Sequence, residues 1–456
     1  MTDRHDSSFR DPSGYLFRRE GTLYRAVNDR YRSHYDLLMS SGLYDELTAA
    51  GLLIPHQEET RAEPPSAGAP YKILRPELVE FISYPYEWSF SQLKDAALAT
   101  LAIQRRALAH GMTLKDASAY NIQFQHGSPV LIDTLSFEAY EPGAPWVAYH
   151  QFCQHFVAPL ALMAYRDVRL SGLMRLHIDG VPLDLATKIL PRRTRLRPSL
   201  AMHLHLHAWA QSRYASSTDS KASRPRKVNL QAMTSNLEGL VRGLSWKPAG
   251  TEWGDYYTFT NYDEAAFGEK RTEIEAFVDA VKPGSVWDLG GNTGFFSRIT
   301  SDRGIPTVSF DIDPAAVEKN YLETKRLQER KLLPLVQDLT NPSPALGWAL
   351  SERESLLQRG PVDLVLFLAM IHHMAIGNNV PFDRVAEFLG KCCRHLAIEW
   401  VPKGDSQVER MLSSREDVFD DYNQDAFEHA FSQLFTVIKK SDIPGTNRTL
   451  YLMKLK

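Results

Sequence analysis

The C-terminal half of the chain alternates short apolar runs with stretches whose apolar residues recur at helical spacing. Continuous apolar strands separated by helices are typical of a parallel sheet that is covered on both faces. The alternation stops at 435–455, where strand, Pro-Gly-containing connection and strand predict an antiparallel hairpin. The predicted parallel strands are 285–291, 306–313, 332–339, 362–370 and 395–401.

The N-terminal half has a different pattern. Residues 13–28 predict a short hairpin around Glu20-Gly21, and residues 121–133 predict two short strands joined at His126-Gly127. Between them, residues 91–111 predict an amphipathic helix that ends at Gly111. Mixed short strands and helices of this kind indicate a separate α+β region.

The clearest break in the pattern lies at 211–228, "QSRYASSTDSKASRPRKV", where polar residues and prolines leave no apolar periodicity. We therefore predict a linker over 211–235, an N-terminal accessory domain over 1–210 and an α/β domain over 236–456. A chain of 456 residues is long for one domain, which agrees with this division.

Composition narrows the class of protein. Hydrophobic residues make up 43% and charged residues 23% of the chain, as in ordinary globular proteins, and the net charge of −3 gives no general attraction to nucleic acid or anionic membranes. The N-terminus lacks a secretory signal, and no apolar run is long enough to span a membrane. The three cysteines do not suggest a disulfide framework. These features predict a cytoplasmic protein and give no oligomeric state.

The stretch "VWDLGGNTGFFSR", residues 286–298, combines a strand, a glycine turn and a helix start, which together offer backbone N–H groups to a ligand. It lacks the G-x-G-x-x-G spacing of dinucleotide-binding folds. Its spacing instead resembles the D-x-G-x-G-x-G turn of class I S-adenosylmethionine-dependent methyltransferases. The resemblance implies a Rossmann-like seven-stranded sheet with a terminal antiparallel hairpin, and S-adenosyl-L-methionine as cofactor. The turn residues that it assigns to the cofactor are Asp288, Gly290, Gly291, Asn292 and Gly294.

Further motifs resemble the same family in the expected order. Asp311 ends the second strand, where the family's acidic residue accepts hydrogen bonds from the ribose, and Ile312 follows it. Asp338 and Leu339 fall where the third strand meets the adenine. The whole chain also resembles bacterial nodulation-type methyltransferases that carry a long N-terminal region.

Two features depart from the family pattern or extend it. Asn292 replaces the usual middle glycine, and asparagine tolerates the left-handed backbone angles of such a turn. It is therefore either a ligand of the cofactor or a tolerated variant with a somewhat weaker affinity for the cofactor. The aromatic segment 252–270 precedes the first strand, where the family often carries a lid, so Tyr257 and Lys270 are further candidate cofactor contacts. Plain aromatic packing is the alternative for this segment.

The methyl acceptor is less well defined. The segment after the fourth strand, "LFLAMIHHM", carries neither N-P-P-Y nor Pro-Cys, which argues against the adenine-, glutamine- and cytosine-C5-methylating subclasses. His372 and His373 are candidate general bases, with a packing role beside the cofactor as the alternative. We expect an O or N acceptor on a small molecule or glycan, and no nucleic-acid partner.

The segment 110–138 contains a second set of polar residues. Asp116 and Asn121 have the D-x-x-x-x-N spacing of a kinase catalytic loop, and Asp133 follows after two short strands. The segment resembles the aminoglycoside and sugar kinases, which implies nucleotide and magnesium binding at these three residues. No glycine-rich phosphate loop is evident, and Lys72 is the only candidate for the phosphate-binding lysine. The protein could therefore be bifunctional, carry a degenerate kinase-like domain, or be a non-catalytic cofactor-binding module.

Two short segments of the N-terminal half allow alternatives. "PRRTRLRP", residues 191–198, could contact phosphate or an acidic partner, or could be a solvated loop. "HLHLH", residues 203–207, would place three histidines on one face if extended and would separate them if helical.

Overall fold

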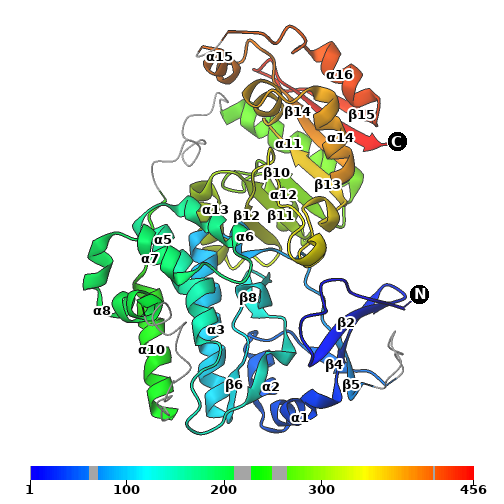
Figure 1. Cartoon of the computed structure of the whole chain (residues 1–456). Helices are drawn as coiled ribbons and strands as arrows, with labels where there is room; N and C mark the ends of the chain where they lie inside the picture. The colour runs from blue at the N-terminus through cyan, green and yellow to red at the C-terminus, as the bar shows by residue number, and fades with distance from the viewer. Residues whose placement is uncertain (1, 61–69, 210–226, 249–263, 414–415) are drawn as a thin grey trace. The chain divides into compact units, whose positions relative to one another are not determined.

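The computed structural model describes residues 2–60, 70–209, 227–248, 264–413 and 416–456 (Figure 1). The chain divides into two compact units. The N-terminal unit comprises Met1–Lys247 and Gly347–Glu352, and the C-terminal unit comprises Pro248–Leu346 and Arg353–Lys456.

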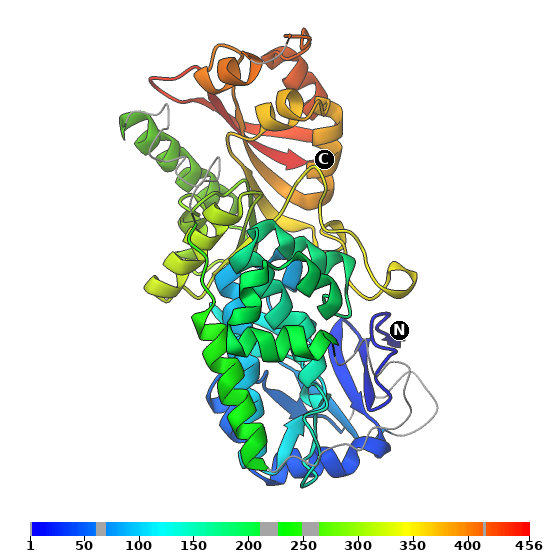
Figure 2. The ribbon, with the colours of Figure 1, turned by 60° about the vertical axis from the view of Figure 1, so that its left-hand side comes forward.

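The C-terminal unit is built on one seven-stranded sheet in the order β12-β11-β10-β13-β14-β16-β15. The first five strands in this order pair in parallel, and β16 joins β14 and β15 antiparallel. Figure 2 shows the hairpin β15–β16 at one end of this sheet. This strand order with a terminal antiparallel pair is typical of class I methyltransferases, so the predicted α/β fold class is confirmed. The strands are β10 (Val286–Leu289), β11 (Thr307–Asp311), β12 (Leu332–Val336), β13 (Val362–Phe367), β14 (Cys393–Trp400), β15 (Phe435–Asp442) and β16 (Thr449–Leu455).

Helices connect the strands of the sheet, as the alternating pattern predicts. The side chain of Asp313 accepts a hydrogen bond from the backbone N–H of Ala315, which caps α13, and Pro314 fits the first helical position. The helix after the glycine turn is short and begins only at Ser297. The helices are α11 (Glu264–Val281), α12 (Ser297–Ser301), α13 (Pro314–Leu327), α14 (Phe382–Cys392), α15 (Ser406–Leu412) and α16 (Gln424–Ser432).

The N-terminal unit contains a five-stranded antiparallel sheet in the order β1-β2-β3-β5-β4. Its central hairpin turns at Glu20 and Gly21, which both have positive φ, as the sequence predicts. A second predicted hairpin, β7–β8, turns at His126 and Gly127 in the same way. The strands are β1 (Thr2–Arg4), β2 (Gly14–Arg19), β3 (Thr22–Val27), β4 (His56–Glu58), β5 (Lys72–Pro76), β6 (Met112–Leu114), β7 (Ile122–Gln125), β8 (Ser128–Leu131) and β9 (Phe137–Ala139).

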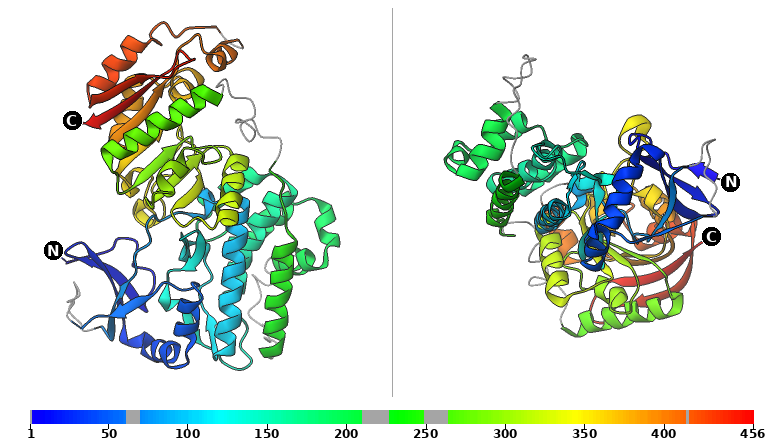
Figure 3. Two further views of the ribbon diagram at one scale, coloured as in Figure 1. Left: turned by 180° about the vertical axis from the view of Figure 1, so that it is seen from behind. Right: turned by 90° about the horizontal axis from the view of Figure 1, so that it is seen from below.

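Helices complete the N-terminal unit. The predicted helix is α3 (Phe90–Ala109), whose N-terminus carries a capping box made by Ser89 and Gln92. Figure 3 shows α10 (Lys227–Gly243) beside α3, and Arg105 of α3 makes an ion pair of 2.8 Å with Glu238 of α10. Further α-helices that lie wholly within the described residues are α1 (Arg32–Ser40), α2 (Leu43–Ala49), α4 (Tyr149–Phe152), α5 (Ala158–Tyr165), α6 (Leu173–Leu176), α7 (Leu183–Ile189) and α8 (Pro198–Leu200).

Part of the expected linker is helical. Residues 210–226 lie outside the described residues, but 227–235 form the first half of α10. Leu230, Leu237 and Val241 are buried at helical spacing, which explains why this part does not behave as a linker. The domain limits 1–210 and 236–456 stay a prediction, beside the compact units that divide at Lys247 and Pro248.

Two smaller expectations concern the histidines and cysteines. The stretch 203–207 lies in the π-helix η8 (Ala201–Leu206) and the first residue of the α-helical segment after it, so it is helical rather than extended. All three cysteines are free and buried.

No helix among the described residues is both long and apolar enough to cross a membrane.

Candidate functional site

The candidate cofactor residues of the C-terminal unit follow the carboxyl ends of its parallel strands. Asp288 and the glycine turn lie at the end of β10, Asp311 is the last residue of β11, and Asp338 follows β12. The carboxyl ends of parallel strands meet at one edge of a sheet, where α/β folds bind their ligands. The structure therefore brings these residues to the same edge.

The glycine turn is held tightly against its neighbours. The N–H groups of Gly290 and Gly291 both donate to the carbonyl oxygen of Phe310, at 2.8 and 2.9 Å. Gly290 has a φ of 93°, and a Cβ there would lie 2.4 Å from the sulfur of Met370. Both the backbone angle and the packing therefore require glycine at this position.

Asn292 adopts the left-handed backbone angle that the sequence allows, with a φ of 49°. Its backbone N–H donates to Oδ2 of Asp311 at 2.8 Å, and its side-chain Oδ1 accepts from the N–H of Thr293 at 2.8 Å. The residue thus ties the glycine turn to the acidic end of β11. The turn forms without a middle glycine.

Asp288 and Asp311 are both buried carboxylates. Ser297 donates to Asp288 at 2.6 Å, while Asp311 accepts from the backbone N–H groups of Asn292 and Asp313. Burial raises the pKa of each carboxyl to about 6, because it removes the charged form from water. Two ionisable groups beside one glycine turn are typical of a ligand site rather than of packing alone.

The residues next to these acids differ in exposure. Ile312 is 55% exposed, which is unusual for isoleucine directly after a buried strand. Asp338 accepts from the N–H and the hydroxyl of Thr340, so its side chain is fixed in a turn after β12. Asp338 and Leu339 are both partly exposed. Ile312 and Asp338 follow neighbouring strands of the sheet. An exposed apolar side chain and a fixed carboxylate in these places are suited to bind a flat ring that has polar groups at its edge.

Lys270 belongs to a buried ionic network. Its Nζ lies 2.6 Å from Oε2 of Glu399 and 4.7 Å from the centre of the Phe296 ring. Glu399 also pairs with Arg448 at 3.3 Å, and Arg448 pairs with Asp405 at 2.8 Å. Burial lowers the pKa of Lys270, and the charge of Glu399 opposes this shift.

Arg448 was not anticipated from the sequence. It lies in the hairpin connection "GTNRTLY", where an arginine normally suggests a solvated turn. Only the register of β16 against β14, which pairs Thr449 with Trp400, brings it beside Glu399. No local sequence signal could have revealed this contact.

His372 and His373 follow β13, with ring centroids 4.2 Å apart. Burial lowers the pKa of His373 to about 4 and that of His372 well below its ordinary value, and the charge of Arg448 lowers both further. Both rings are therefore neutral near pH 7. Nδ1 of His372 is buried and has no hydrogen-bond partner among the described residues. Tyr257, the other candidate near the cofactor, lies outside the described residues.

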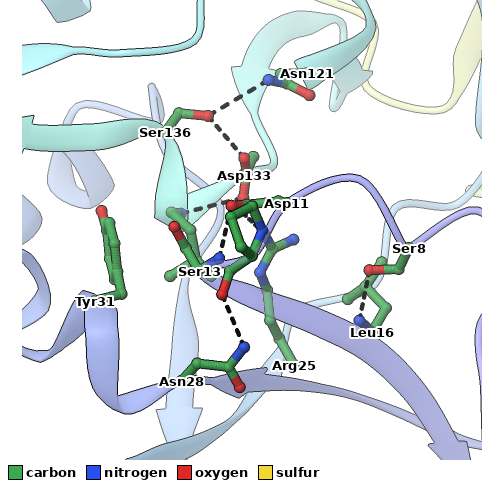
Figure 4. A network of polar contacts seen from close by, with 12 residues as sticks. Ser8, Asp11, Ser13, Leu16, Arg25, Asn28, Tyr31, Asn121, Asp133 and Ser136 are labelled. Carbon is green, nitrogen blue, oxygen red and sulfur yellow. Dashed lines mark hydrogen bonds and ion pairs between the residues drawn. The ribbon is translucent and has the colours of Figure 1, made fainter.

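The candidate kinase-like residues also lie together in the N-terminal unit. Asn121 donates to the hydroxyl of Ser136 at 3.4 Å, and Ser136 donates to Oδ2 of Asp133 at 2.8 Å (Figure 4). Asp116 interacts with Asn121 and accepts from Gln151 at 2.8 Å. Burial raises the pKa of Asp116, and the charge of Asp133 adds to the shift. The two residues of the D-x-x-x-x-N motif therefore lie close to Asp133 in the folded N-terminal unit.

The positively charged side chain that contacts Asp133 of this cluster is Arg25, whereas Lys72 is the residue expected from the sequence. Nη2 of Arg25 lies 2.7 Å from Oδ1 of Asp133, whereas Lys72 pairs with Glu58. The sequence "LYRAV" already places this basic residue on the central hairpin, although the kinase pattern calls for a lysine.

The chain's own donors already occupy much of the carboxylate of Asp133. Both carboxylate oxygens of Asp133 already accept from the chain's own groups: Arg25 and the N–H of Leu135 at one oxygen, and Ser136 at the other. Among the described residues, no group of three histidine, cysteine or carboxylate side chains is placed to hold a metal ion. Arg25 supplies the positive charge that a bound cation would bring.

Comparison with known proteins found a relative that matches nearly the whole chain. The chain is 36% identical over 455 residues to the nodulation protein NoeA of Rhizobium meliloti (strain 1021), and the match covers 97% of this chain and 94% of NoeA. No protein-family model matches the chain.

Solved structures resemble part of the chain at low identity. The N-methyltransferase NodS from Bradyrhizobium japonicum WM9 is 12% identical, with a TM-score of 0.30 over 42% of this chain and 98% of NodS. The magnesium protoporphyrin IX methyltransferase ChlM from Synechocystis PCC 6803 is 14% identical, with a TM-score of 0.32 over 45% of this chain and 93% of ChlM. WbdD, described as a bifunctional kinase-methyltransferase, is 15% identical, with a TM-score of 0.29 over 42% of this chain and 40% of WbdD.

Proposed function

The chain belongs to the same family as the nodulation protein NoeA, and we propose that its C-terminal unit is an S-adenosylmethionine-dependent methyltransferase. The acceptor that we propose is an oxygen or nitrogen atom of a small molecule or glycan.

One observation carries this proposal: the buried carboxylate of Asp311 lies under the glycine turn, beside the exposed side chain of Ile312. Oδ2 of Asp311 accepts from the N–H of Asn292 and Oδ1 from that of Asp313, both at 2.8 Å, and the N–H of Ile312 also interacts with the carboxylate. A carboxylate has about four lone-pair positions, so it can still accept from a ribose hydroxyl. Ile312 would then lie against the face of the adenine, with Asp338 near its amino group.

The residues present fit the cofactor. S-adenosylmethionine supplies an electrophilic methyl group on a sulfonium. The chain has to bind it, keep water away and hold the acceptor atom in line, and such positioning accounts for much of the rate in transfer reactions. The turn from Gly290 to Gly294 would hold the amino acid part of the cofactor, at the end of β10.

The acceptor would lie near His372. This imidazole is neutral near pH 7 and almost fully buried, so it would order the segment after β13 that borders the acceptor and would not contact the acceptor atom itself. A base with so low a pKa removes protons weakly at neutral pH. We therefore assign His372 a positioning role and treat general-base catalysis as the alternative.

Methyl transfer can be tested with cofactor labelled in its methyl group and a panel of glycans and small hydroxyl or amino compounds. Label should enter at least one acceptor with wild-type protein and none with Asp311→Ala. The exposed acid Asp279, which pairs with Arg303 at 2.8 Å, provides the matched control Asp279→Ala. Cofactor binding without transfer to any acceptor would instead favour the non-catalytic binding module.

For the N-terminal unit we propose a kinase-like accessory domain that does not transfer phosphate. The ion pair between Arg25 and Asp133 supports this, because it occupies the acid that would otherwise hold magnesium. Titration with ATP and magnesium should give no metal-dependent binding to the wild-type chain. Metal-dependent ATP binding that Asp133→Ala removes would favour a bifunctional enzyme.

A further inference from the structure

One surface of the N-terminal unit is unusually basic. Arg192, Arg193 and Arg195 lie in the short helix η7 (Arg192–Leu196), Arg197 follows it, and all four side chains are exposed. Within the described parts of the chain, none of the four makes an ion pair with a carboxylate. Other exposed arginines are paired locally, for example Arg326 with Glu323 and Arg384 with Glu387. The chain as a whole has a net charge of −3, so this cluster is a local feature.

Exposed apolar side chains lie beside these arginines. Leu196 is 85% exposed, Leu206 is 57% exposed and Met202 is 45% exposed. Met202 and Leu206 are four residues apart in the helical segment η8, so they point to similar sides of it. Large aliphatic side chains exposed to this extent cost free energy in water unless a partner covers them.

A hydrogen bond joins the two groups. The hydroxyl of Thr194, between Arg193 and Arg195, lies 2.9 Å from Nε2 of His205, which directly precedes Leu206. The arginine turn is therefore fixed against the helix that carries the apolar side chains. Trp209, 51% exposed, follows on the same segment.

We propose that this surface, made of Arg192, Arg193, Arg195, Leu196, Arg197, Met202 and Leu206, binds the anionic face of a phospholipid bilayer. Arginines attract negatively charged headgroups, and neighbouring aliphatic side chains insert at the boundary between headgroups and acyl chains. A nucleic acid or an acidic peptide would satisfy the arginines but would leave Leu196 and Leu206 in water. The lipid surface satisfies both groups, so the N-terminal unit lies on the membrane through this surface.

Vesicle co-sedimentation of the full chain tests the proposal. The chain should bind vesicles that contain phosphatidylglycerol and should not bind phosphatidylcholine alone. Changing the four arginines to glutamine should weaken binding by about fivefold for each charge removed at low salt. Leu196→Ser with Leu206→Ser should weaken it roughly tenfold. Added salt should weaken the binding of the wild-type chain.

Matched controls come from the C-terminal unit. Arg271, Arg326, Arg384 and Arg394 are exposed and each pairs with a carboxylate, so changing these four to glutamine removes the same charge elsewhere. Leu322→Ser with Leu327→Ser removes two exposed leucines of α13. Both controls should bind vesicles like the wild-type chain. Circular dichroism checks that every variant is folded, and Arg193→Gln with Arg195→Gln replaces the fourfold variant if that variant is not.

Three outcomes would overturn the proposal. Equal binding to both vesicle types would show that anionic lipid is not recognised. Full binding by the leucine variant would show that no apolar insertion occurs. Binding to a DNA oligonucleotide or heparin without binding to vesicles would assign the arginines to a different polyanion.

Discussion

The Nζ of Lys270 lies 2.6 Å from the Oε2 of Glu399, and both side chains are almost completely buried. Lys270 is on α11, before the first strand of the sheet, and Glu399 is near the end of β14. The pair therefore connects two elements that enclose the carboxyl edge of the sheet. With Arg448 and Asp405 it forms a network of two positive and two negative charges.

Breaking this network should destabilise the C-terminal unit strongly. Glu399→Ala leaves Lys270 and Arg448 buried without their shared partner, and we expect the free energy of unfolding to fall by about 3–5 kcal/mol. Urea unfolding measures the change. Lys439→Met is the control: it breaks a more exposed pair with Glu273, and we expect it to cost less than about 1 kcal/mol. A loss for Glu399→Ala as small as that of the control would contradict the account.

Asn292 offers a test of the glycine turn through backbone strain. Its φ of 49° is open to glycine and unfavourable for a β-branched residue. Asn292→Gly keeps the N–H that binds Asp311 and should change cofactor affinity less than tenfold. Asn292→Val should weaken the affinity by about tenfold or more, since strain of this kind costs on the order of 1–3 kcal/mol. If glycine weakened binding as much as valine, the asparagine amide would be a direct ligand instead.

The raised pKa of Asp288 predicts a pH dependence of stability. The pKa is 3.8 ordinarily and about 6 in the folded protein, so the unfolded chain loses this proton first as the pH rises. Asp288 therefore costs no stability below about pH 4; the cost grows between pH 4 and 6 and is complete above that, at roughly 3 kcal/mol or less.

Asp288→Asn should remove this cost, because the amide oxygen can still accept from Ser297. The variant should gain stability relative to wild type as the pH rises from about 4 to 6, and the gain should then stay constant. Unfolding free energies of the two proteins across this range provide the measurement. A difference in unfolding free energy that does not change with pH would mean that the pKa of the Asp288 carboxyl is not raised.

The positioning role of His372 predicts the shape of the pH–rate profile. Both histidines are neutral well below pH 7, so no imidazole ionisation should appear between about pH 6 and 8. His372→Gln should lower kcat by roughly tenfold to a hundredfold through lost alignment, without altering the profile. A wild-type inflection near neutrality that disappears in this variant would identify His372 as a general base.

The fold of the C-terminal unit could be predicted from the sequence because its buried strands are continuous apolar runs. Val286–Leu289 and Thr307–Asp311 are buried at every position, so these strands lack the alternation of a half-buried strand and differ from the segments around them as mostly apolar runs. Asp288 and Asp311, in contrast, are predicted as site residues by the resemblance to the methyltransferase family, whose motifs carry an acid at or near the end of each of these strands.

Contacts between distant segments could not be predicted in this way. Arg448 reaches Glu399 only through strand register, and Arg25 reaches Asp133 across more than a hundred residues of sequence. Buried ion pairs give no periodic signal, because each partner alone is typical of a solvated surface. The sequence does not indicate helix α10, because its apolar positions follow directly after a polar segment that has no periodicity.

Calorimetric titration with S-adenosylmethionine tests the central claim most directly. The wild-type chain should bind with micromolar affinity, Asp311→Ala should abolish binding, and the control Asp279→Ala should bind like wild type. The affinity of wild type should also rise as the pH increases through about 6, because the ionised carboxylate of Asp311 accepts more strongly from hydroxyls. No binding by the folded wild-type chain, or unchanged binding by Asp311→Ala, would contradict the account.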